Sequence, residues 1–368
     1  MLPPMAKRAT IRDVAREAGV GVTTASNIVN QHPGSSYKAE TRGRVLRAVQ
    51  TLEYSPNWSA RTLRTRQTLA VGVVVSDLLG NYFSDLIYAV EKRLDAHHYQ
   101  ILLCQSHGDP VIHERQIQVL RERNVDGLLV QIVHASANNA LYRRLEMTTT
   151  PIVYFDSKAD LADMTSPLVE SNQPQLTRLA VDHLWKMGHR EIFFLSGSPH
   201  HINARERREG FLQAMSECGV PSPEGYIVEA GYQEEHGQQG FQRLWESRKP
   251  FTALIASSIY CGYGVMGRAR EMGLKIPEDF SLVTIGGGRE AARMGLTDID
   301  QNPQLIGETM SDLLLTLLHD KNSKPQANGT APTGVSLPLH HRIEPMLHIR
   351  QSTQEPKAQS RVGARAAK

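Results

Sequence analysis

The chain carries, between residues 22 and 30, a run of short side chains that could read the edges of DNA bases. Hydroxyl and amide groups in this run can donate and accept hydrogen bonds, and the run contains no acidic residue. A helix that enters the major groove needs such groups, because acids are repelled by phosphate and long side chains hold the backbone away. The side chains concerned are Val22, Thr23, Thr24, Ser26, Asn27 and Asn30. An ordinary three-helix bundle with a polar surface helix is the alternative at this point.

Three short helices are expected to position these groups. The apolar residues of segment 10–20 recur at i, i+3, i+4 and i+7, with Thr10 at the N-cap and Gly19 where a left-handed residue ends a helix. Further helices are predicted over about 22–30 and about 39–52, and the tight turn at Gly19 makes the first two a helix-turn-helix. The residues expected to face the core are Ile11, Val14, Ala15, Ala18, Ala25, Ile28, Val29, Val45, Ala48, Val49 and Leu52.

The charge of the chain is unevenly distributed, although its formal total is only +3. Residues 1–68 hold eleven lysines and arginines and four acidic residues, a net charge of +7. Residues 354–368 carry +3, which leaves −7 on residues 69–353. A basic head on an acidic body indicates that the head alone meets a polyanion, and a solvated charged arm is the other interpretation.

Length and composition exclude several classes of protein. A chain of 368 residues with 40% hydrophobic and 21% charged residues is a globular protein of two or three domains. It contains no run approaching the roughly 20 apolar residues of a membrane helix, and its N-terminus lacks the apolar core of a secretory signal. Three widely spaced cysteines without a C-x-x-C motif argue against disulfides and zinc, so we expect a cytoplasmic protein without a metal.

The sequence of the body, residues 69–353, predicts alternating strands and helices, a pattern typical of βαβ units and parallel sheets. Its β-branched apolar runs form two groups of four, and two such groups predict two similar lobes. The predicted strands are 69–75, 99–105, 126–133, 151–156, 191–195, 226–230, 251–256 and 280–285. The predicted helices include 81–97, 113–123, 173–187, 204–218 and 234–245.

Ligands of parallel sheets bind beyond the carboxyl ends of the strands, so two facing lobes predict a cleft at those ends. The residues that follow the predicted strands include Asp77, Asn81, Tyr82, Phe83, Asp156, Ser257, Ser258 and the glycines 286–288. The three glycines lack the G-x-G-x-x-G spacing of a dinucleotide loop, so we expect no such cofactor. No nucleophile, base and orienting group are spaced for catalysis, and we expect neither catalytic residues nor an enzyme.

The head closely resembles that of the lactose-repressor/galactose-repressor family of transcription regulators. The resemblance is carried by TIRDVAREAGVGVTTASNIVN, ETRGRV and LEYSPNWSARTLRT. It implies that Val22, Thr23 and Asn27 face base edges, and that Thr10, Thr24, Ser26 and Asn30 lie at or near phosphates. It also implies a hinge helix in SPNWSARTL that enters the minor groove, with Leu63 as an apolar wedge and Asn57 at the DNA backbone.

Two residues of the head depart from the family pattern. Gly21 stands where the family usually has a serine N-cap, a loss of only a few tenths of a kcal/mol. Glu53 stands where glycine or asparagine is usual, and a left-handed backbone there would cost about 1 kcal/mol. Neither change is expected to prevent folding.

The resemblance continues through the body, over residues 10–353 in all. GVVVSDLLGNYFSDLIYAVE, KMGHREIFFLSGSP, ARERREGFLQAM and MGLKIPEDFSLVTIG match an effector-binding core similar to periplasmic sugar-binding proteins. By this resemblance Tyr82 and Phe83 line the ligand, and Arg207 grips its polar groups, as a guanidinium fork can. Core packing is the alternative for the two aromatic residues, and a surface charge is the alternative for Arg207.

Two acids that many family members use for sugar hydroxyls are missing. Ser258-Ile259 replaces an Asn-Asp pair, and Gly286 replaces an aspartate. A sugar would lose charge-assisted hydrogen-bond acceptors at both places. We therefore expect an effector that is not a typical sugar, and a regulator that binds no effector is the second hypothesis.

These observations predict an α/β protein with a small all-α helix-turn-helix head, a hinge helix and a two-lobed periplasmic-binding-protein-like core with parallel sheets. Its function is that of a dimeric DNA-binding regulator, by family resemblance a repressor, on a near-palindromic operator and under the control of a small molecule. The expected segments are 1–9 (flexible N-terminus), 10–55 (helix-turn-helix), 56–68 (hinge), 69–353 (core) and 354–368 (disordered basic tail). Lobe 1 is expected over about 69–165 plus 300–325, and lobe 2 over about 166–299 plus 326–353.

Overall fold

The computed structural model divides the chain into two compact units, Met1–Thr68 and Leu69–Lys368. It describes residues 9–30, 35–54, 67–78, 81–133, 135–157, 164–199, 201–322 and 338–357. The predicted flexible residues 1–9 lie outside this part of the chain except for residue 9, and the predicted hinge 56–68 lies outside it except for residues 67 and 68.

The first unit is the predicted bundle of three helices. The helices are α1 (Ile11–Glu17), α2 (Val22–Val29) and α3 (Ala39–Thr51). Their core consists of buried Val14, Ala15, Ala18, Ala25, Ile28, Val45 and Ala48, all of them predicted to face inward. Gly19 has a φ of +62° and Gly21 is the N-cap of α2, so the glycine turn between the first two helices is confirmed. Glu53 has a φ of +44°, which confirms the strained left-handed position expected there.

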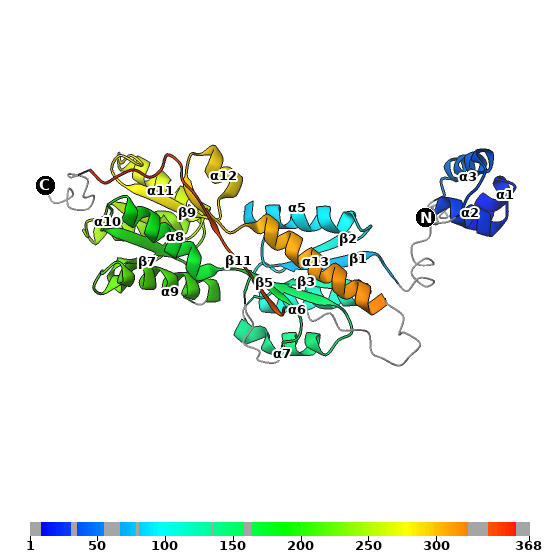
Figure 1. Ribbon diagram of the computed structural model, residues 1–368, viewed down its shortest axis with the longest axis horizontal. Coiled ribbons are helices and arrows are strands. Elements are labelled where there is room, and N and C mark those ends of the chain that lie inside the picture. The colour runs from blue at the N-terminus through cyan, green and yellow to red at the C-terminus, as the bar shows by residue number, and fades with distance from the viewer. Residues whose placement is uncertain are drawn as a thin grey trace, which may run out of the picture. The chain divides into compact units, whose positions relative to one another are not determined.

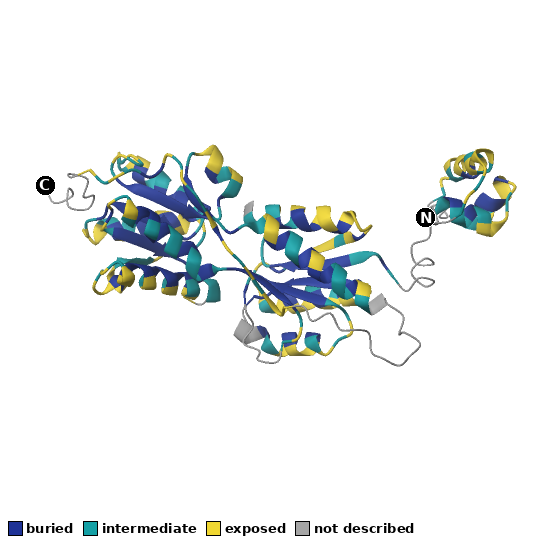
Figure 2. Cartoon of the chain, viewed as in Figure 1, coloured by how far each residue is buried: buried dark blue, intermediate teal, exposed yellow. Residues whose placement is uncertain are grey.

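The first sheet of the second unit has six strands in the order β11-β5-β4-β3-β1-β2, and all neighbouring strands are parallel. Its strands are β1 (Ala70–Val75), β2 (Gln100–Gln105), β3 (Gly127–Gln131), β4 (Ile152–Phe155), β5 (Leu168–Ser171) and β11 (His340–Ile343). Its helices are α5 (Asn81–Asp95), α6 (Pro110–Glu122), α7 (Ala135–Glu146) and α13 (Pro303–Asn322). One face packs against α5 and α13, and the other packs against α6 and α7, so both faces are buried (Figures 1 and 2).

The second sheet also has six strands, in the order β12-β10-β9-β8-β6-β7. Its strands are β6 (Ile192–Ser196), β7 (Ile227–Glu229), β8 (Ala253–Ala256), β9 (Ser281–Ile285), β10 (Thr297–Asp300) and β12 (Met346–His348). Its helices are α8 (Gln173–Lys186), α9 (Ile202–Glu217), α10 (Glu234–Glu246), α11 (Ile259–Glu271) and α12 (Gly288–Arg293), with a 3-10 turn, η1 (Pro223–Tyr226). Only β12 runs antiparallel to its neighbour, β10, among the strands described here.

The eight predicted strands are confirmed, but the expected lobe boundaries need correction. Four further strands, β5, β10, β11 and β12, were not predicted from the sequence. Strand β5 belongs to the first sheet, so the first lobe extends past residue 165 to Ser171. Strand β11 also belongs to the first sheet, although residues 326–353 were expected in the second lobe. Strand pairing assigns both segments to the first lobe, because β5 pairs with β4 on one side and with β11 on the other.

Three connections within the described residues therefore cross between the lobes: β5 to α8, β10 to α13, and β11 to β12. The Asn172 amide of the first connection donates a hydrogen bond to Glu344 of the third at 2.9 Å. Because all three segments must bend together, they are the natural hinge for any lobe movement.

The start of the expected disordered tail is packed against the second lobe. The Gln354 carbonyl oxygen accepts from His189 Nε2 at 2.9 Å and from the Ser281 hydroxyl at 3.1 Å. The prediction of disorder is therefore wrong at Gln354, and residues 358–368 lie outside the described part. No helix in the described ranges is long and apolar enough to cross a membrane.

Candidate nucleic-acid interface and interlobe site

Helix α2 presents the predicted reading groups on the side away from the core. Val22 is 45% exposed and Thr23 is exposed, whereas Ala25 and Ile28 on the opposite side are buried. The first turn of α2 contains no acidic residue, and its last turn contains no basic residue. Its accessible side chains are therefore short and uncharged, and most of them can form hydrogen bonds, as binding in a DNA groove requires.

Several of the other residues predicted to contact DNA form hydrogen bonds within the head. Asn27 Nδ2 donates to the Tyr37 hydroxyl oxygen at 3.0 Å. Asn30 Nδ2 donates to the Ser26 carbonyl oxygen at 2.7 Å, at the end of α2. The Thr10 hydroxyl donates to Asp13 at 2.7 Å at the start of α1. The half-buried Thr24 completes the described set, and Asn57 and Leu63 lie outside the described residues.

The second candidate site is organised around Arg207 of α9, which is only 6% exposed. Its Nε donates to Gln173 Oε1 at 2.7 Å, and its two terminal nitrogens donate to the Ser257 carbonyl oxygen at 2.8 Å and to Gln301 Oε1 at 3.0 Å. The guanidinium carbon also lies 5.8 Å from the ring centre of Tyr232. All three hydrogen-bond acceptors are neutral, so the positive charge has no carboxylate in direct contact.

Asp156 provides the nearby negative charge from the first lobe. It directly follows β4 with a φ of +77°, and its carboxylate accepts from Gln131 at 2.8 Å and from Asn203 at 3.4 Å. Burial raises the pKa of Asp156, against the opposing effects of the Gln131 hydrogen bond and the positive charge of Arg207. Since Asn203 belongs to α9, this contact joins the two lobes.

Three buried polar atoms near these charges have no hydrogen-bond partner among the described residues. They are the Tyr82 hydroxyl, Gln173 Nε2 and Asn203 Oδ1. Burial, followed by the charge of Asp156, raises the pKa of Tyr82 well above its ordinary value, so its hydroxyl stays protonated. An unpaired buried polar group costs about 1–3 kcal/mol, so the arrangement favours a bound polar molecule. We call Tyr82, Asp156, Gln173, Asn203 and Arg207 the interlobe site.

The other residues that were predicted to bind the ligand are not part of the interlobe site as defined above. Phe83 packs edge-to-face on Tyr82, with ring centres 5.0 Å apart, and also touches the core of the first lobe. Asp77 accepts a hydrogen bond from Gln105 at 3.1 Å, and Asn81 is the first residue of α5. The Ser258 hydroxyl accepts from the Cys261 amide at 3.0 Å and donates to the Tyr232 carbonyl at 2.6 Å. Ser258 therefore caps α11 and has no hydroxyl proton left for a ligand.

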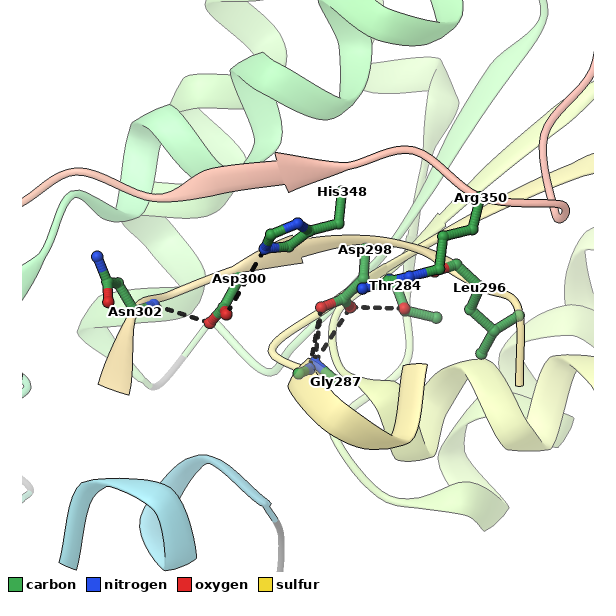
Figure 3. A network of polar contacts seen from close by, with 9 residues as sticks. Thr284, Gly287, Leu296, Asp298, Asp300, Asn302, His348 and Arg350 are labelled. Carbon is green, nitrogen blue, oxygen red and sulfur yellow. Dashed lines mark hydrogen bonds and ion pairs between the residues drawn. The ribbon is translucent and has the colours of Figure 1, made fainter. Parts of the chain in front are cut away.

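The glycine loop after β9 is closed by the chain itself (Figure 3). The buried Asp298 carboxylate accepts hydrogen bonds from the Thr284 hydroxyl at 2.6 Å and from the backbone amides of Gly287 and Gly288 at 3.0–3.2 Å. These bonds occupy the amides that a phosphate would need. At Gly286 a Cβ atom would lie 2.7 Å from Gln301 Nε2, so the glutamine that binds Arg207 occupies the space of a side chain there.

A second contact across the lobes lies at α12. Arg289 forms an ion pair with Asp85 of α5, and the Arg289 side chain is 76% exposed. Near the crossing segments, His348 lies 3.8 Å from Asp300, which also accepts from the Asn302 amide at 2.8 Å (Figure 3). Among the described residues no group of three or more His, Cys, Asp or Glu side chains could hold a metal ion.

The neutral partners of Arg207 and Asp156 were not predicted from the sequence. These are Gln131, Gln173, Asn203, Tyr232 and Gln301. Gln131 had a usable signal, because it ends a strand that was predicted. Gln301 had none, because it follows a strand that the sequence pattern did not reveal.

Known proteins resemble both the head and the body of this chain. Residues 10–57 match the family described as bacterial regulatory proteins, lacI family, and residues 181–353 match a periplasmic binding protein-like domain. The chain is 31% identical over 322 residues to the HTH-type transcriptional repressor PurR of Klebsiella pneumoniae (strain 342), covering 87% of this chain and 93% of that one. PurR of Yersinia pestis (strain Pestoides F) is 30% identical, with 86% and 93% covered. A crystal structure of the lac repressor dimer bound to operator and the anti-inducer ONPF is 25% identical, covers 95% of this chain and 100% of that chain, and has a TM-score of 0.77.

The unpaired Tyr82 hydroxyl leads to a stability prediction. Tyr82→Phe should change the free energy of unfolding of the ligand-free protein by no more than about 1 kcal/mol, because the hydroxyl faces the Asp156 carboxylate but has no hydrogen-bond partner at normal geometry among the described residues. Urea unfolding measures this. Tyr142→Phe is the matched control, since its hydroxyl binds the Val133 amide at 3.0 Å and carbonyl at 3.1 Å, and it should cost about 1–2 kcal/mol. Equal losses in the two variants would show that the Tyr82 hydroxyl is already satisfied by the protein.

Proposed function

The chain belongs to the lacI family of bacterial regulatory proteins, and on that premise we propose that it represses transcription as a homodimer controlled by a small molecule at the interlobe site. As a member of this family it is a DNA-binding regulator of transcription. The observation that carries the proposal for the ligand is the set of three unpaired buried atoms around Arg207 and Asp156. Because an operator lies on bacterial DNA, we propose that the protein acts in the cytoplasm, and we propose no enzymatic activity.

We assign DNA reading to the exposed side of α2. Val22 offers van der Waals contact, for example to a thymine methyl, so hydrogen-bonded reading falls to Thr23 and Asn27. Thr10, Thr24, Ser26 and Asn30 are assigned to phosphates, Asn57 to the DNA backbone and Leu63 to a wedge in the minor groove. The net charge of +7 on residues 1–68 supports this division, because phosphate neutralisation supplies much of the affinity of such proteins.

The effector is proposed to be a polar molecule held by the guanidinium of Arg207, the Tyr82 phenol, the amides of Gln173 and Asn203, and the carboxylate of Asp156. Two features argue against the usual mode of sugar binding. Ser258 caps a helix, and the Asp298 carboxylate beside Gly286 is fully hydrogen-bonded by the chain. A regulator without an effector is the second candidate, and the unpaired atoms favour the first, since a polar ligand at the interlobe site would give them hydrogen-bond partners.

The second copy is proposed to cover the β2 edge of the first sheet. Helices α5 and α6 flank β2, and this edge exposes Tyr88, Leu102, Leu103 and Val111, at 61%, 36%, 37% and 76%. Apolar side chains beside an unpaired strand edge normally need a cover. A two-fold copy fits, because two heads must read the two half-sites of a near-palindromic operator.

Asn27→Ala tests the assignment of DNA reading. After the operator has been mapped by footprinting the gene's own upstream region, the variant should lose about 1–3 kcal/mol of discrimination at one base pair of each half-site. Titration of operator variants measures this loss. Thr24→Ala is the control, because losing a phosphate contact lowers the affinity for all sequences alike. A uniform loss for Asn27→Ala would contradict its assignment to a base edge.

Leu103→Glu tests the interface. A charge on the β2 edge should shift the protein from dimer to monomer in analytical ultracentrifugation and weaken operator binding at least tenfold, because each head then binds alone. Met147→Glu is the matched control, since Met147 is 86% exposed and follows α7. A Leu103→Glu protein that remains dimeric would place the interface elsewhere.

A further inference from the structure

The amide of Asn27 is held by a residue outside the recognition helix. Asn27 Nδ2 donates to the hydroxyl oxygen of Tyr37, 3.0 Å away and ten residues further along the chain. Tyr37 lies in the segment that leads into α3, and its ring packs against the core of the head. The packed ring therefore anchors the hydroxyl that accepts the hydrogen bond from Asn27.

The other groups of α2 are held differently. Thr23 and Val22 are exposed at the start of the helix, and Asn30 turns back onto the Ser26 carbonyl of its own helix. Among the described residues predicted to read bases, Asn27 is thus the one whose side chain forms a hydrogen bond with another segment of the head.

This contact matters because the terminal torsion of an asparagine side chain is broad. An unanchored carboxamide must lose that freedom when it binds a base, and the loss weakens the complex. An anchored amide has already lost it. After donating one hydrogen to Tyr37, Asn27 keeps its second N–H and its Oδ1, the two groups with which asparagine can bind adenine N7 and N6 together.

We propose that Tyr37 is a positioning residue for DNA reading, which fixes the Asn27 amide and thereby sets discrimination at the base pair that Asn27 contacts. The inference rests on the proposed function, in which Asn27 faces a base edge. Tyr37 itself acts through Asn27 and touches no base. Its own hydroxyl proton stays available, so a direct contact from Tyr37 to a phosphate is the competing role.

Tyr37→Phe tests the proposal, because it removes the hydroxyl and keeps the ring in the core. Affinities are measured for the mapped operator and for operators changed at each base pair of the half-site. The variant should lose about 3- to 10-fold in discrimination at the Asn27 base pair, and none at the other positions. A loss of this size is expected when one side chain regains its conformational freedom. In the Asn27→Ala background the same change should have no further effect. Tyr226→Phe is the matched control, because it removes a tyrosine hydroxyl that donates to Glu191 at 3.2 Å in the second lobe, away from the head and from the proposed interface.

The outcomes separate the inference from the function on which it rests. Unchanged discrimination in Tyr37→Phe, with a loss in Asn27→Ala, overturns the role of Tyr37 alone. A Tyr37→Phe loss that is equal for all sequences overturns it in favour of a phosphate contact. A uniform loss in Asn27→Ala instead overturns the assignment of Asn27 to a base edge.

Thermal unfolding shows whether the head remains folded in Tyr37→Phe. If it does not, para-fluorophenylalanine at position 37 provides the second variant, because it keeps the length of tyrosine but has a poor hydrogen-bond acceptor. The same loss of discrimination at one base pair is expected with this residue. Wild-type discrimination with it would overturn the proposal.

Discussion

The interlobe site depends on one buried positive charge. Arg207 is shielded from water and is satisfied by oxygens from the start of α8, the end of β8 and the segment after β10. Leaving a buried charge without partners costs several kcal/mol, so these three elements must stay in register around it. Two of them, α8 and the segment after β10, adjoin connections that cross to the first lobe. Arg207, which holds the site together, therefore also lies next to the connections that cross between the two lobes.

The same charge explains why the site suits a polar ligand. All direct partners of Arg207 are neutral, and the Asp156 carboxylate lies on the other lobe. A molecule that binds both groups, together with Tyr82 and Asn203, must contact both lobes at once. Its binding energy can then favour one arrangement of the lobes over another, and this difference is the physical content of allosteric control. The net positive charge of +7 resides in residues 1–68, so the proposed DNA-reading surface and the proposed ligand site lie in different units of the chain.

The sequence predicted most of the fold because buried parallel strands read as continuous apolar runs. It missed β5, β10, β11 and β12 because these strands are short and their apolar runs are interrupted by polar residues: β5 contains Glu170 and β10 contains Asp298 and Asp300. Arg207 was predicted through family resemblance, and Tyr82 also by its place after a predicted strand, whereas the amide partners of Arg207 follow no local pattern. The loss of an acid at Gly286 was recognised, but its cause was not. Only the structure shows that Gln301 fills that space on its way to Arg207.

The most direct test of control by the interlobe site is reciprocal linkage between ligand and operator. Thermal-shift screening of polar metabolites identifies a ligand whose effect disappears in Arg207→Ala. Its affinity is then measured by calorimetry with free and with operator-bound protein, and operator affinity is measured by fluorescence anisotropy with and without it. The proposed mechanism predicts a change of about 5- to 150-fold, with the same factor in both directions. A ligand that binds at Arg207 with equal affinity to free and operator-bound protein would contradict it.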